Sequence, residues 1–156
     1  MRFTELRPVI LHLIGLLLLS ACSTLLPTRY PPRAGPAPAR IDLPAPSAVR
    51  SMGEVRLQAA RRLVAANPAE TYVGVVPDVL LAIPVLEVEL NADGSIRRIE
   101  VLRKPKQALD TVPIAIDAVR RAAPFGNVAG LPKPWKFTET FLFNDERKFK
   151  PRTLDD

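Results

Sequence analysis

The fold of this chain is decided by residues 85–102, VLEVELNADGSIRRIEVL. Apolar side chains occupy every second position of residues 85–90, and two of the three positions between them are glutamates. This period of two is typical of a β-strand with one buried and one solvated face. Residues 91–94, Asn-Ala-Asp-Gly, predict a turn in which Gly94 adopts a positive φ. We therefore expect an antiparallel β-hairpin whose second strand runs from residue 96 to residue 102.

Two amphipathic helices are expected on either side of this hairpin. Residues 52–66 carry apolar side chains at steps of three and four, which predicts a helix with one buried stripe. Ser51 and Glu54 have the spacing of a capping box at its start. The same pattern predicts a second helix over residues 111–123, with Asp110 at its N-cap.

The chain is then expected to end on an aromatic strand over residues 135–143, WKFTETFLF. A short strand over residues 72–76 is a further expectation. The order helix, hairpin, helix, strand predicts an α+β fold, with both helices on one face of a small antiparallel sheet. This domain is expected to occupy residues 48–156.

The first residues indicate export. Residues 1–21 have a basic start and an apolar core of signal-peptide length, and they end in small residues directly before Cys22. This pattern resembles a bacterial lipobox, in which the leader is removed and the cysteine carries acyl chains. The alternative is an uncleaved anchor, because residues 9–26 contain no charged side chain and are just long enough to span a bilayer.

A linker is expected between the leader and the domain. Residues 22–47 contain seven of the chain's 17 prolines, which disfavour both helix and central strand. We expect an extended, solvated stalk.

Composition excludes most catalytic chemistries. The only histidine, His12, and the only cysteine, Cys22, lie in or directly after the leader, so the domain has neither imidazole nor thiol. Nucleophilic triads and the usual zinc sites need those groups. The formal net charge is +6, with 22 basic and 16 acidic residues, but no nucleic-acid-binding module is visible. We expect no enzyme activity, no catalytic residue, no metal, no cofactor and no nucleic-acid partner.

The ordered set of elements resembles the TonB C-terminal domain family, which includes TonB-like and TolA-like energy transducers. The resemblance is carried by the hairpin of residues 85–102, Leu109-Asp110, the helix with Ala115 to Ala123, Pro124-Phe125, and the strand with Phe137 to Phe143.

This resemblance implies a function as well as a fold. Domains of this family bind a short segment of an outer-membrane transporter by strand pairing and pass on force from an inner-membrane motor. It implies that the last strand is the open edge, with five candidate binding residues: Trp135, Phe137, Glu139, Phe141 and Phe143. The alternative is that these aromatic residues only build the core, with Glu139 as an exposed strand charge.

The expected location is the periplasm of a Gram-negative cell envelope, with the protein anchored at Cys22 and the outer membrane favoured. The expected partner is an outer-membrane transporter or another envelope protein, and a dimer formed by exchange of the last strand is left open. A lipid anchor at the outer membrane would remove contact with an inner-membrane motor. The alternative function is therefore a structural lipoprotein that scaffolds the envelope without energy transfer.

Overall fold

A computed structural model of the chain describes residues 41–155, and these form an α+β fold as the sequence predicts. The leader of residues 1–21, Cys22 and most of the expected linker lie outside the described residues. The elements, in chain order, are α1 (Met52–Ala66), β1 (Val85–Leu90), β2 (Ile96–Arg103), α2 (Thr111–Ala122), β3 (Lys136–Phe143), β4 (Phe149–Pro151) and the 3-10 turn η1 (Arg152–Leu154). No described helix has the length and apolar character needed to cross a bilayer.

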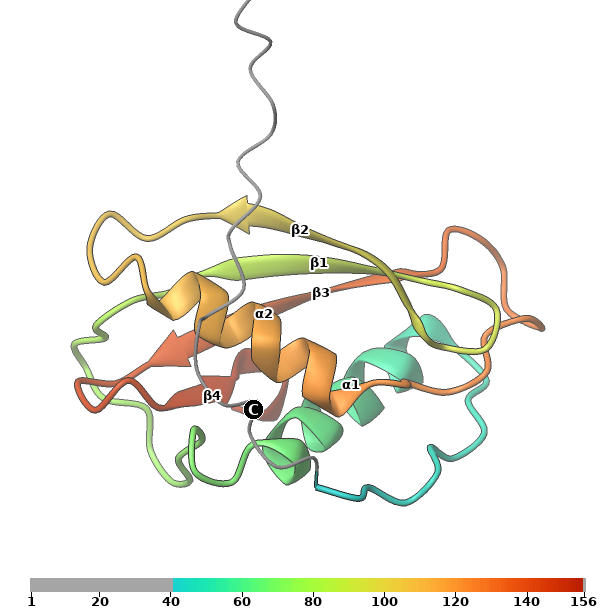
Figure 1. Cartoon of the computed structure of the whole chain (residues 1–156), viewed down its shortest axis with the longest axis horizontal. Helices are drawn as coiled ribbons and strands as arrows, with labels where there is room; N and C mark the ends of the chain where they lie inside the picture. Colours follow the sequence, from blue (N-terminus) through green and yellow to red (C-terminus); the bar gives the residue numbers. More distant parts are fainter. Residues whose placement is uncertain (1–40, 156) are drawn as a thin grey trace, which may run out of the picture. The chain divides into compact units, whose positions relative to one another are not determined.

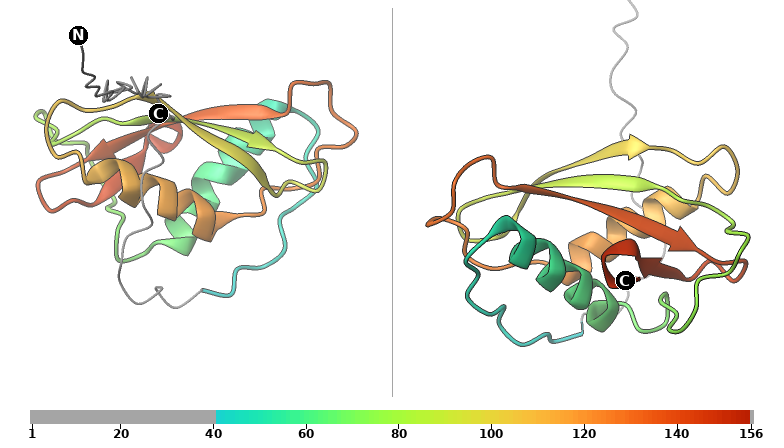
Figure 2. Two further views of the ribbon diagram at one scale, coloured as in Figure 1. Left: turned by 45° about the horizontal axis from the view of Figure 1, so that its top comes forward. Right: turned by 180° about the vertical axis from the view of Figure 1, so that it is seen from behind.

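The four strands form one antiparallel sheet in the order β2-β1-β3-β4. Both helices lie on the same side of this sheet, and α2 crosses in front of it in Figure 1. The opposite view in Figure 2 shows β3 and β1 running side by side, with α1 beneath them. The fold therefore has two layers, as expected for an antiparallel sheet that buries one face.

The hairpin of β1 and β2 forms where the sequence predicts it. The backbone amide of Asn91 donates to the carbonyl oxygen of Ser95 (2.9 Å), which closes the turn. Gly94 has a φ of 81°, a conformation that residues with a Cβ rarely adopt. The turn also packs against the chain that follows α2, because the amide of Phe125 donates to the carbonyl of Gly94 (2.9 Å).

The start of α1 is capped as predicted, but the start of α2 is not. The hydroxyl of Ser51 accepts a hydrogen bond from the amide of Glu54 (3.2 Å), and Glu54 in turn accepts from the amide of Arg50 (2.7 Å). Asp110 occupies the cap position of α2, yet its side chain makes no capping hydrogen bond. Its carboxylate pairs instead with the guanidinium of Arg147 (2.7 Å), because the β3–β4 turn comes within reach.

The core lies between the sheet and the helices. Aromatic edge-to-face contacts join Phe125 to Phe137, with ring centroids 5.3 Å apart, and Phe141 to Phe149, 5.1 Å apart. The aliphatic part comes from the predicted stripes of the two helices and from alternate positions of β1: Val55, Ala59, Leu63, Leu86, Val88, Leu90, Val112, Ala115 and Val119.

Three details differ from the sequence expectations. Residues 72–76 form no strand; only Thr71 makes an isolated bridge, to Phe149. The short strand β4 lies in the C-terminal segment, where no strand was expected. The domain also begins before residue 48, because Arg62 donates to the carbonyl of Pro44 (2.7 Å) and Gln58 binds Ser47.

Candidate binding edge

The predicted binding strand is not an edge of the sheet. β3 pairs with β1 over Lys136–Thr140 and, on its other side, with β4 over Phe141–Phe143, so within the described residues no strand pairs with its first half on the β4 side. The prediction that the last aromatic strand is the outermost strand is wrong, because β4 lies outside it in the strand order. The physical reason is the C-terminal segment, which turns back and adds β4 to the outside of β3.

The aromatic side chains of the predicted site belong mostly to the core. Phe137, Phe141 and Phe143 are buried beneath the helices. Trp135 comes just before β3 and is half-buried. Its indole nitrogen donates to the carbonyl of Leu131 (2.8 Å), and the ammonium of Lys133 lies 4.7 Å from its ring centroid. These contacts explain the aromatic residues by packing rather than by a binding role.

Glu139 is also buried, with none of its surface exposed, so its interpretation as an exposed strand charge is wrong. Its Oε1 accepts hydrogen bonds from the amides of Thr140 (3.0 Å) and Thr153 (3.2 Å), whereas Oε2 has no hydrogen-bond partner. Desolvation raises the pKa of this carboxyl, against the opposing effect of those hydrogen bonds and of Arg56. The sequence could have indicated this burial, because Glu139 shares the odd-numbered, buried face of the strand with the phenylalanines.

The outer edge of β4 is partly covered as well. The amide of Tyr72 donates to the carbonyl of Phe149 (3.3 Å), and the amide of Phe149 donates to the carbonyl of Glu70 (2.8 Å). Because β4 has only three residues, this contact leaves little of its edge free. Strand addition needs a longer row of unpaired backbone groups.

The long open edge is β2. Its eight residues pair with β1 on one side, and within residues 41–155 no strand pairs with the other side. Figure 1 shows β2 as the outermost ribbon of the sheet, at the top of the view. This edge is the candidate functional site.

The direction of the backbone groups along β2 follows from the ladder. The amide of Leu90 donates to Trp135 and that of Phe141 to Pro84, so even-numbered residues of β1 bond to β3. The odd-numbered residues must then bond to β2, where Glu87 pairs with Glu100 and Glu89 with Arg98. The amides and carbonyls of Ile99 and Val101 consequently point away from the sheet, toward solvent.

The side chains along β2 and the three residues after it are mostly basic, although Arg97 and Arg98 are paired with acids. Residues 97–106 contain five basic residues and the single acid Glu100, a net charge of +4. Arg97 and Arg98 both contact Glu89, at 3.1 and 3.4 Å. Leu102 is 52% exposed and adds an apolar contact among the charges. The edge could therefore hold an extended segment through backbone hydrogen bonds and attract acidic side chains.

The sequence did not identify β2 as the edge, because strand order is a long-range property. The available signal was the turn Asn144-Asp145-Glu146-Arg147 after β3, followed by Phe149, which together suggest a further strand beside it.

Comparison of the chain with protein-family models, with curated proteins and with solved structures finds no match. The described residues hold no group of three or more side chains suited to a metal ion.

Proposed function

We propose that this protein is a membrane-tethered, TonB-like binding module of the bacterial envelope whose β2 edge pairs with an extended segment of another envelope protein. The single observation that carries the proposal is the open edge of β2, with the backbone groups of Ile99 and Val101 directed outward. A segment of an outer-membrane transporter is the first candidate, in keeping with the resemblance of the sequence.

The charge of the β2 edge indicates which kind of partner segment it would bind. Backbone hydrogen bonds give affinity with little demand on side chains, so specificity has to come from the residues that flank them. A net charge of +4 along residues 97–106 favours an acidic segment and speeds its encounter at low salt. The same arginines oppose pairing with a basic strand or with a second copy of β2.

A structural envelope lipoprotein is the second candidate, and the sequence around Cys22 favours it. A chain that is acylated at Cys22 and sorted to the outer membrane has no segment in contact with an inner-membrane motor. The same β2 edge would then hold a partner in place without transmitting force. The chemistry of the mature N-terminus separates this scaffold from an energy transducer.

The binding proposal is tested by amide chemical shifts of the isotopically labelled chain. A short peptide of alternating threonine and glutamate, and peptides from outer-membrane transporters, should shift the amides of residues 96–103. A matched threonine–lysine peptide should not. Shifts confined to residues 149–151, or none with any acidic peptide, would contradict the assignment to β2.

Peptide N-methylation supplies a second, sharper control. In a strand pair only every second amide of the peptide points at β2. Methylation at one set of alternate positions should therefore abolish binding, while methylation of the other set should leave it intact. Equal effects from both sets would mean that side-chain charge alone holds the peptide.

A further inference from the structure

The loop between α1 and β1 carries the most exposed apolar side chains of the described chain. Val73, Val75 and Val79 are 88%, 93% and 80% exposed, within a stretch of seven residues. Scattered exposed apolar residues are ordinary on protein surfaces, but three nearly uncovered valines within seven residues of one loop are an unusual concentration. This set of three is called the valine loop below.

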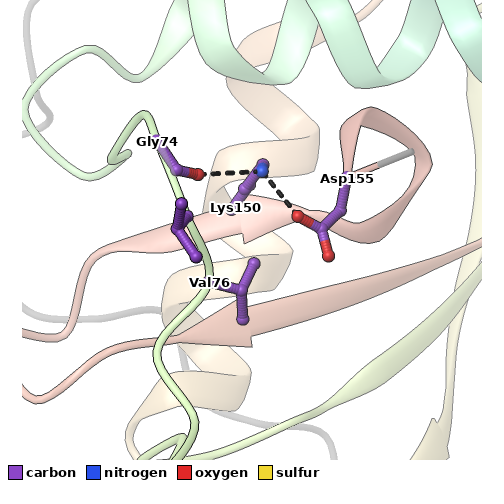
Figure 3. Close-up of a pocket in the computed structure, with 5 residues that line it drawn as sticks. Gly74, Val76, Lys150 and Asp155 are labelled. Carbon is purple, nitrogen blue, oxygen red and sulfur yellow. Dashed lines mark hydrogen bonds and ion pairs between the residues drawn. The ribbon is translucent and has the colours of Figure 1, made fainter.

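Contacts with β4 fix the position of this loop. The ammonium of Lys150 donates to the carbonyl of Gly74 (3.0 Å) and pairs with the carboxylate of Asp155 (2.6 Å), as Figure 3 shows. Val75 and Val76 both line the shallow pocket formed there, but Val76 is half-buried whereas Val75 is almost fully exposed. The loop is thus held at its base while its outer valines project from the domain.

The loop and the first described residues lie on the same side of the domain. In Figure 1 and in the right-hand view of Figure 2, the first described residues (cyan) and this loop (green) lie on the side away from β2. The segment between Cys22 and Ile41 has 18 residues, which reach at most about 60 Å even when fully extended as polyproline. A domain on so short a tether stays close to the bilayer that holds it.

We propose that the valine loop inserts into the surface of the phospholipid bilayer to which the chain is tethered and so orients the domain with β2 facing away from it. The proposal rests on the membrane tether of the proposed function, but not on the β2 edge. Lys150 is paired with Asp155 and Asp78 on the loop is acidic, so attachment of the loop to lipid would rest on its valines and not on electrostatic attraction.

Such contact is weak on its own and becomes effective through the tether. Stable membrane attachment usually needs two signals, such as an acyl anchor together with a second apolar or basic contact. The tether raises the local concentration of bilayer that the loop experiences, so a few valines suffice to bias its orientation. The loop would be the second signal.

The test uses the full chain reconstituted in vesicles of phosphatidylethanolamine and phosphatidylglycerol. A polarity-sensitive fluorophore is placed on Val75→Cys and, as the matched control, on Leu102→Cys at the exposed β2 edge. The parent chain, treated in the same way, reports any label on Cys22. We expect a blue shift and quenching by spin-labelled lipid at position 75 only. No shift at position 75, or equal shifts at both positions, would overturn the proposal.

A second measurement keeps the result independent of the label. Replacing Val73, Val75 and Val79 by threonine preserves their shape and removes their apolar character. On the same vesicles the tethered parent chain should show slowed amide hydrogen exchange in residues 73–79, and this triple change should remove most of that protection. The matched change Leu102→Thr should leave it unaltered. Unchanged protection in the triple variant would contradict the proposal even if peptides bind β2, so the two claims fail separately.

Discussion

The backbone of Gly126 occupies the space that a side chain on Gly94 would need. A Cβ at position 94 would lie 2.6 Å from the amide nitrogen of Gly126 and closer still to its carbonyl oxygen. The contact joins the β1–β2 turn to the segment after α2, and the hydrogen bond from Phe125 to Gly94 reinforces it. The turn that presents β2 is thus fixed by a close approach of two backbones.

This contact predicts a large effect of Gly94→Ala. The substitution forces a Cβ into backbone atoms at a φ of 81°, so it should lower the free energy of unfolding by roughly 3 kcal/mol, measured by urea denaturation. Gly74→Ala is the matched control: φ is also positive there (94°), but nothing lies within 4 Å of the added carbon. Its cost should be roughly 1–2 kcal/mol, from backbone strain alone. Equal losses for the two variants would show that the close approach adds nothing.

Arg62 links three parts of the domain and should be sensitive to substitution. Its guanidinium donates to the carbonyl of Ala122 (2.9 Å) at the end of α2 and to that of Pro44 (2.7 Å), and the side chain is buried. Arg62→Met keeps most of the stem but leaves both carbonyls without this donor, at a cost of about 1–3 kcal/mol in urea denaturation. The neighbouring exposed Arg61→Met should change stability by less than about 0.5 kcal/mol. A neutral Arg62→Met would mean that water replaces both contacts.

Glu139 should give the stability of the chain a specific pH dependence. Its pKa is raised above the ordinary value of 4.5, chiefly by burial, so the folded state holds the proton more tightly than the unfolded state. Stability from this group is therefore greatest at low pH and falls as pH rises from about the ordinary value through the raised pKa. Above that range the folded chain carries a buried carboxylate.

Glu139→Gln tests that dependence. The variant removes the buried charge while its side-chain oxygen can still accept from the amide of Thr153. Its melting temperature should exceed that of the parent near neutral pH, and the difference should shrink toward acidic pH. The exposed Glu100→Gln on β2 serves as the control. A difference that does not vary with pH would show that Glu139 does not titrate in this range.

The proposed membrane tether would be attached at Cys22. If Cys22 is acylated, metabolic palmitate labelling should be lost completely in Cys22→Ala. Mass spectrometry of the mature N-terminus provides the second readout. An unlabelled parent chain that retains its leader would instead favour an uncleaved anchor and a spanning transducer.

The sequence determined the local elements because each depends on neighbours along the chain. The alternation in residues 85–90 and the apolar stripes of both helices repeat with the period that lets a strand or a helix bury one face. The glycine turn is likewise set by adjacent residues. These patterns placed α1 and the hairpin within a residue or two of their observed bounds, and they gave the α+β class.

Tertiary structure alone decided which strand has a free edge. The pairing of β4 with Phe141–Phe143, and of Phe149 with Glu70 and Tyr72, joins segments far apart along the chain. No local period encodes such contacts, because they depend on where the chain after β3 can find unpaired backbone donors and acceptors. The pairing of β4 with β3 places the aromatic strand inside the sheet and leaves β2, the most highly charged strand, at the open edge. Glu139 is buried in the same arrangement.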